Sequence, residues 1–188
     1  MTSGSVRARG DEDETDLELI GRWKSGDGRA ATKLVARHSQ ALARFTVSSG
    51  ERVEVEEIVQ DTFVRAFGAI DSFRGESLFR TWLFTIARRL ILDRRRAEKR
   101  SRNIVEIKET DSVSEYGALD AIVAEEAAER VRQALEKLTP MQREVFTLRV
   151  QQGLAYKEIA EVVGSTEGAT RVHYHNAVET IKRYLRDD

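Results

Sequence analysis

Proline occurs once in this chain of 188 residues, at Pro140, and most of the sequence repeats apolar residues at helical spacing. Proline interrupts helices, and an apolar residue at every third or fourth position is typical of a helix that buries one side. A strand would instead alternate apolar and polar residues, and no segment shows that pattern clearly. The sequence therefore predicts an all-α protein.

Charge is unevenly distributed along the chain, although 31 basic and 32 acidic residues give a net charge of −1. Five acidic residues crowd positions 11–16, a basic block covers positions 88–102, and the weakly patterned segment "NIVEIKETDSVSEYGALD" separates two helical blocks. Such acidic, poorly patterned segments are typical of tails and linkers. We predict a disordered acidic tail (1–15), a helical domain (16–102), a flexible linker (103–126) and a second small helical domain (127–188).

Composition excludes several classes of protein. The chain has no cysteine, which rules out disulfides, thiolate catalysis and cysteine-based zinc sites. Its N-terminus lacks the apolar core of a signal peptide, and no apolar stretch approaches the roughly 20 residues of a membrane helix. With three histidines, no glycine-rich phosphate loop and no recognisable pair of carboxylates, we expect no enzyme, cofactor or metal site. We expect a cytoplasmic protein without membrane insertion of its own.

The segment "RTWLFTIARRLILDRRRAEKR", residues 80–100, predicts an amphipathic helix with a basic outer face. On a helical wheel, its large apolar residues share one arc. The cations gather on another arc: Arg88, Arg89, Arg95, Arg96 and Lys99. Such a face is often merely solvated. Here arginine predominates and few acidic partners stand at helical spacing, which favours an anionic partner such as a nucleic acid backbone.

Three aromatic residues stand beside this basic face, in or next to the turn of "DSFRGESLFRTW", residues 71–82. Phe73, Phe79 and Trp82 could stack on single-stranded bases while the arginines hold phosphates, since stacking contributes about 1–3 kcal/mol per base. The alternative is that these rings belong to the core, which the pattern favours more for Phe79 and Trp82 than for Phe73.

The second domain begins with strong helix signals. Thr139 is a good N-cap, Pro140 suits the first helical position, and Gln142 completes a capping box. This helix is predicted to end near Gly153.

A shorter helix, "YKEIAEVV", follows and ends at Gly164; Ser165 or Thr166 then caps a third helix that runs to Leu185. Two helices joined by a tight turn with glycine form the helix-turn-helix pattern, although such a pair can also be purely structural.

The third helix presents a polar outer face. Its predicted buried side contains Thr170, Tyr174, Ala177, Val178, Ile181 and Leu185. Its predicted outer side contains Arg171, Val172, His175, Asn176, Glu179 and Lys182. The N-terminal part of such a face enters the DNA major groove in helix-turn-helix proteins. His173 and His175 do not suggest a metal pair, because residues two apart on a helix point in nearly opposite directions.

Residues 56–96 and 135–178 together resemble the extracytoplasmic-function (ECF) group of bacterial sigma factors, with the motifs in the family's order and spacing. The resemblance implies a region-two domain that binds core RNA polymerase and the minus-ten promoter element. It also implies a region-four helix-turn-helix domain that reads the minus-thirty-five element, and a linker that runs near the RNA exit path. The expected partners are core RNA polymerase, promoter DNA (duplex and melted non-template strand) and an anti-sigma factor.

The resemblance assigns three sets of residues. The polymerase-binding residues are Glu57, Gln60, Asp61 and Val64 on the outer face of "EEIVQDTFVRAF". The minus-ten residues are Phe73, Arg74, Ser77, Phe79, Arg80, Trp82, Arg88, Arg89, Arg95, Arg96 and Lys99. The minus-thirty-five residues are Lys157, Thr166, Glu167, Arg171, Val172, His175 and Asn176.

The chain departs from the family pattern at three positions. Arg89 replaces a frequent asparagine that helps to line the base pocket, and His173 and Asn176 stand where basic residues are common. The absence of basic residues at positions 173 and 176 predicts weaker or less salt-sensitive binding to duplex DNA, or a different minus-thirty-five sequence. Two other functions remain open: a free-standing helix-turn-helix regulator, and an adaptor that sequesters another regulator.

Overall fold

A computed structural model describes residues 14–50, 54–102 and 130–187 of the chain. The predicted linker (103–126) and most of the predicted tail (1–15) lie outside these residues. The described residues form helices and contain no strand, which confirms the all-α prediction. None of the described helices has both the length and the apolar character that a membrane crossing requires.

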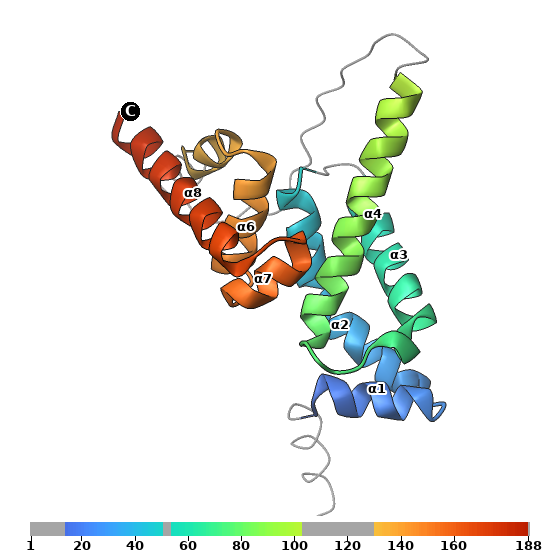
Figure 1. Cartoon of the computed structure of the whole chain (residues 1–188). Coiled ribbons are helices and arrows are strands. Elements are labelled where there is room, and N and C mark those ends of the chain that lie inside the picture. The colour runs from blue at the N-terminus through green and yellow to red at the C-terminus, as the bar shows by residue number, and fades with distance from the viewer. Residues whose placement is uncertain (1–13, 51–53, 103–129, 188) are drawn as a thin grey trace, which may run out of the picture.

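The first group of helices comprises α1 (Asp16–Lys24), α2 (Gly28–Ser48), α3 (Val55–Gly68) and α4 (Phe79–Arg102), with a short 3₁₀ turn at Ile70–Ser72. The helices α2, α3 and α4 pack on one another, and α1 packs across α2 (Figure 1). The helix α4 is long, and its C-terminal half rises beyond the rest of this group (Figure 1).

Local signals explain where α1 begins. The Thr15 hydroxyl accepts a hydrogen bond from the Glu18 backbone, and the Glu18 carboxylate accepts one from the Thr15 amide, a complete capping box. Glu14 forms ion pairs with Arg22 and Lys33. The helical domain therefore starts at Glu14 and Thr15, the two residues that we predicted as the end of the tail.

The second group comprises helical residues 130–136, α6 (Pro140–Val150), α7 (Tyr156–Val163) and α8 (Glu167–Asp187). The predicted cap is present at α6, where Thr139 and Gln142 exchange hydrogen bonds. Gly164 ends α7 with φ +66°, a left-handed conformation that glycine adopts without steric cost. Thr166, one of two predicted caps, accepts a hydrogen bond from the Ala169 amide at the start of α8.

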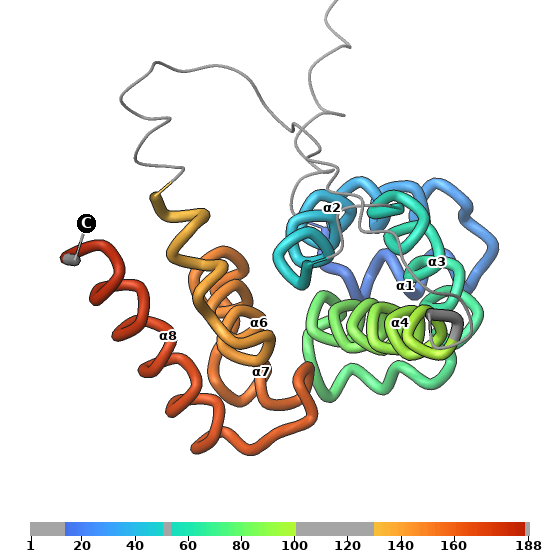
Figure 2. The backbone as a smooth tube through the Cα atoms, turned by 90° about the horizontal axis from the view of Figure 1, so that it is seen from above, coloured from blue at the N-terminus to red at the C-terminus, as the bar shows by residue number. Residues whose placement is uncertain are grey.

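The two groups lie side by side (Figure 2), with α7 against α4 and α6 against α2. Buried apolar residues of both groups, including Phe84 of α4 and Ile159 of α7, belong to one continuous hydrophobic cluster. The sequence predicted two domains but not this direct packing between them.

Candidate nucleic-acid interface

The three predicted aromatic residues form one cluster where α4 begins. The ring centroids of Phe73, Phe79 and Trp82 lie 5.2–5.8 Å apart. Phe79 is 3% exposed, whereas Phe73 and Trp82 are half-buried. Phe73 and Trp82 therefore keep part of their surface accessible, while Phe79 packs against them from the core. Arg74 is exposed and Ser77 half-buried on the same loop.

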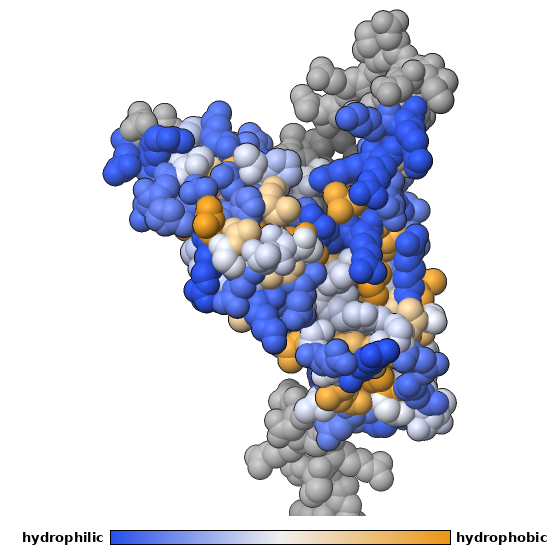
Figure 3. Space-filling view, in the orientation of Figure 1, coloured by the Kyte–Doolittle hydropathy of each residue, from blue (hydrophilic) through white to orange (hydrophobic). Residues whose placement is uncertain are grey.

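The predicted basic stripe divides into exposed cations and cations held inside the molecule. Arg89, Arg96 and Lys99 are exposed on α4, and Figure 3 shows hydrophilic side chains along the C-terminal half of this helix. By contrast, the Arg95 guanidinium donates a hydrogen bond to the Ser49 carbonyl at the end of α2. Arg88 Nε donates to Glu144 Oε2 at 2.8 Å. The exposed stripe is thus narrower than the sequence pattern indicated.

The region between α4 and the second group of helices contains further polar contacts. Thr81 Oγ1 donates a hydrogen bond to Glu158 Oε1 at 3.1 Å, and Arg80 Nη1 donates to the Gln152 carbonyl at 3.4 Å. Glu144 is 4% exposed. Arg80 Nε and Gln152 Nε2 are buried and have no hydrogen-bond partner among the described residues.

The residues predicted to read the minus-thirty-five element lie on the outer face of α8 and close to its start. Arg171, Val172, His175 and Asn176 are all exposed, with Val172 at 57%. On the preceding elements, Lys157, Thr166 and Glu167 are exposed as well. These seven side chains lie on α7, on α8 or in the turn between them, as a helix-turn-helix requires. His173, in contrast, is half-buried, so its place in the family pattern lies off the outer face.

Tyr156 lies beside the predicted recognition residues, and the sequence reasoning did not single it out. Two guanidinium groups lie over its ring, with Arg149 at 4.8 Å and Arg171 at 4.5 Å from the centroid. Arg171 also forms an ion pair with Glu167 at 2.6 Å. Arginine stacks well on aromatic faces, so Tyr156 and Glu167 together restrain the direction of the Arg171 side chain. The available signal was an aromatic residue at the first position of α7.

The predicted polymerase-binding face on α3 is exposed, and Val64 is 70% exposed. Glu57 and Gln60 are exposed too, and Asp61 is half-buried; Glu57 and Asp61 contact Arg94 of α4 at 2.9 and 3.4 Å. Burial lowers the pKa of Arg94, but the Glu57 hydrogen bond and the nearby carboxylates outweigh burial and raise it. Arg94 therefore holds the α3 carboxylates in place and offsets their mutual repulsion.

Comparisons with known proteins identify the family to which the chain belongs. Residues 34–101 match the family described as sigma-70 region 2, and residues 128–181 match sigma-70 region 4. The ECF RNA polymerase sigma-E factor of Escherichia coli K12 is 32% identical over 182 residues, which cover 90% of this chain and 94% of that protein. The chain belongs to the ECF group of sigma factors.

Further relatives of this sigma factor cover most of its length. The ECF RNA polymerase sigma factor BldN of Streptomyces coelicolor is 32% identical over 92% of this chain and 66% of BldN. Among solved structures, CnrH in complex with the cytosolic domain of CnrY has a TM-score of 0.69 and 31% identity, over 93% of this chain and 99% of CnrH. The sigma factor RpoE of Bartonella quintana, solved with the anti-sigma factor NepR, has a TM-score of 0.69 and 26% identity, over 84% of this chain and 97% of the RpoE chain.

Proposed function

We propose that this sigma factor binds core RNA polymerase, recognises the minus-thirty-five and minus-ten promoter elements, and promotes DNA melting at the start of transcription. The observation that carries the proposal is the pairing of two sites in one chain. A half-exposed pair of rings, Phe73 and Trp82, stands beside exposed cations of α4, and an exposed helix-turn-helix face stands on α8.

The chemistry proposed for the first domain (residues 16–102) is the capture of unstacked bases. Phe73 and Trp82 offer aromatic faces, while Arg89, Arg96 and Lys99 attract the non-template backbone. Stacking on these rings would offset the few kcal/mol lost when a base leaves the duplex. The sigma factor would then catalyse no covalent step itself, and would act in the cytoplasm with the polymerase.

The two proposed DNA sites cannot be used together in the packed arrangement. The two promoter elements are named for positions −35 and −10, so they lie about 25 base pairs apart, which is about 85 Å along B-form DNA. A compact body of 144 residues, the number that the structure describes, has a radius of gyration of about 15 Å. In addition, Arg88, a proposed minus-ten residue, is occupied by Glu144. We infer that the region-four domain (127–188) leaves α4 when the protein engages a promoter.

The packed arrangement also suggests how the protein is controlled. The CnrH and RpoE structures to which the chain is similar were solved in complexes, the second with an anti-sigma factor. We propose that an anti-sigma partner binds this sigma factor and keeps its two DNA-binding surfaces from the promoter.

In vitro transcription from a genomic fragment library, with bacterial core polymerase in the presence and absence of the protein, tests the proposed function. New start sites that depend on the protein are expected, and alignment of their upstream sequences would reveal both promoter elements. Binding to polymerase without new starts would identify an inhibitory or sequestering relative. Binding to duplex DNA without any binding to polymerase would instead identify a free-standing regulator.

A further inference from the structure

The aromatic cluster of the proposed minus-ten site rests on a histidine that the function described so far does not use. The buried ring of Phe79 lies against Phe73 and Trp82, with centroids 5.5 and 5.8 Å away. The same ring meets the imidazole of His38, from α2, edge-on at 5.6 Å. Phe79 therefore links His38 to the two rings that bases can reach.

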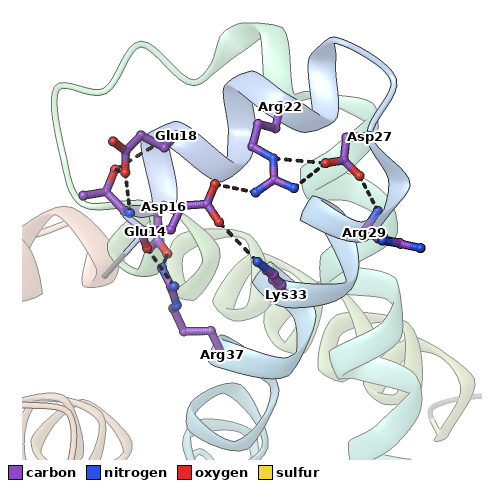
Figure 4. Close-up of polar contacts among 9 residues, drawn as sticks. Glu14, Asp16, Glu18, Arg22, Asp27, Arg29, Lys33 and Arg37 are labelled. Atoms are coloured by element: carbon purple, nitrogen blue, oxygen red, sulfur yellow. Dashed lines mark hydrogen bonds and ion pairs between the residues drawn. The ribbon is translucent and has the colours of Figure 1, made fainter. Parts of the chain in front are cut away.

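The imidazole of His38 is itself held by a carboxylate of α1. His38 Nε2 and Asp16 Oδ2 share a hydrogen bond of 2.9 Å, and His38 is 8% exposed. Asp16 also accepts a hydrogen bond from Arg37 Nη1 at 2.7 Å, while Arg37 Nη2 donates to the Glu14 carbonyl at 2.8 Å. Figure 4 shows Arg37 reaching up from α2 to this end of α1. Asp16 is thus fixed between two partners from α2.

This arrangement orients the imidazole as well as filling space. A buried imidazole needs a polar partner, and the hydrogen bond at one ring nitrogen fixes the plane of the ring. Burial of Asp16 raises its pKa, but the hydrogen bonds and charges of His38 and Arg37 outweigh burial and lower it. The Asp16 carboxylate is therefore charged near neutral pH, and it sets which edge of the imidazole meets Phe79.

A second contact from α1 reaches the loop that carries Phe73. A Cβ atom placed on Gly75 would lie 3.5 Å from Leu17 Cδ2, so the Leu17 side chain stands next to the loop backbone there. Gly75 has φ +73°. Asp16 and Leu17 are the first two residues of α1. The start of this helix thus touches the loop directly through Leu17 and supports its rings through His38.

We propose that the Asp16–His38 pair is a positioning device for the minus-ten site: it holds Phe79 so that Phe73 and Trp82 stay in the arrangement that receives unstacked bases. This inference rests on the proposed function of the loop. Neither residue touches DNA in this proposal; they act only through Phe79. Loss of the hydrogen bond lets the imidazole turn, and the rings then lose their common orientation without loss of the helical core.

The test compares two affinities of the full-length protein. One is the affinity for core polymerase. The other is the affinity of the resulting holoenzyme for a single-stranded oligonucleotide that carries the non-template minus-ten sequence of a promoter mapped by the transcription experiment. His38→Phe keeps an aromatic ring against Phe79 and removes the bond to Asp16. Asp16→Ala removes the same bond from the other side, and Asp16→Asn restores an acceptor.

We expect His38→Phe and Asp16→Ala to lower oligonucleotide affinity about tenfold, as when about one molecule in ten keeps the receptive ring arrangement, with polymerase affinity unchanged. Asp16→Asn should recover most of the loss. Arg37→Ala is the matched control, because Arg37 binds the same carboxylate but has no ring contact with the cluster; it should leave oligonucleotide affinity within about twofold of wild type.

Trp82→Ala separates failure of this inference from failure of the proposed function. If Trp82→Ala abolishes oligonucleotide binding while His38→Phe and Asp16→Ala bind normally, the loop is the minus-ten site and the positioning role is wrong. If Trp82→Ala also binds normally, the minus-ten assignment fails and the inference fails with it. A parallel loss of polymerase affinity in His38→Phe and Asp16→Ala would show that the pair merely stabilises the fold, which also overturns the inference.

Discussion

Replacing Glu144 by alanine should separate the region-four domain from α4. In the packed arrangement, Arg88 Nε and Glu144 Oε2 are 2.8 Å apart, and the exposed fractions of the two side chains are 17% and 5%. The Coulomb attraction at that distance is about 6 kcal/mol with an effective dielectric constant of 20, against a desolvation cost of several kcal/mol per ion. The net contribution of the pair is therefore small, but either ion alone is costly.

Glu144→Ala leaves the Arg88 guanidinium enclosed without its carboxylate. Removal of one partner from a buried pair costs about 3–5 kcal/mol, and the lower value applies here because Arg88 retains some exposure. Opening relieves this cost, since Arg88 then reaches water. A change of about 3 kcal/mol shifts the equilibrium between packed and separated domains about a hundredfold toward separation.

Energy transfer between two fluorophores measures this equilibrium directly. The sequence has no cysteine, so cysteines introduced at exposed Thr32 of α2 and Arg183 of α8 give two specific labelling sites. Transfer should fall in Glu144→Ala and stay unchanged in Glu161→Ala, which removes an exposed glutamate from α7 with the same change of charge. The double variant Arg88→Met with Glu144→Ala should pack again, because no ion is then left enclosed.

The reasoning would be refuted by unchanged energy transfer in Glu144→Ala, which would mean that the apolar contacts alone hold the domains together. It would equally be refuted if the double variant were as open as the single one, because the unpaired charge would then not be the cause.

Three further predictions concern single sites. Asp16→Asn should make the free energy of unfolding depend less on pH in the acid range, which circular dichroism at a series of pH values would follow. The pKa of Asp16 is lowered in the folded state, so the stability that its carboxylate contributes is complete above the unfolded-state pKa, near 4, and is lost as the pH falls through the lower folded-state pKa. Gly164→Ala should destabilise the second domain by about 1–2 kcal/mol in urea denaturation, because φ at this residue is +66°; an unchanged midpoint would contradict the left-handed turn. Asn176→Arg should strengthen binding to minus-thirty-five duplex and steepen the salt dependence by about 0.9 in log–log slope, one phosphate contact, in titrations at two or more salt concentrations.

Local signals made the helix-turn-helix predictable from sequence. The capping residues Thr139 and Gln142 are three positions apart and exchange their hydrogen bonds within one turn, and Gly164 ends α7 through its own backbone conformation. The outward face of α8 followed from helical periodicity alone. Such features depend on neighbours within a few residues, so the sequence contains nearly all of the relevant information.

The contacts that the sequence did not predict join residues far apart in the chain. Arg88 binds Glu144, which is 56 residues away in the sequence, and Arg95 binds the Ser49 carbonyl, which is 46 residues away. Helical spacing within α4 therefore indicated neither partner. Glu144 was equally unpredictable, because a glutamate in the second turn of a helix is ordinarily exposed. The burial of Phe79 fell within the alternatives that the sequence left open, and its contact with His38 required the packing of α2 on α4.

The contact of Arg171 with the Tyr156 ring affects the conformational entropy of the proposed DNA binding. A free arginine side chain loses about 2 kcal/mol of rotamer entropy when it is immobilised. Arg171 is already restrained by the Tyr156 ring and by Glu167, so part of this loss has occurred during folding. If α8 enters the major groove as proposed, less ordering of Arg171 remains for that step, and this preorganisation should appear mainly as slower dissociation from the minus-thirty-five duplex.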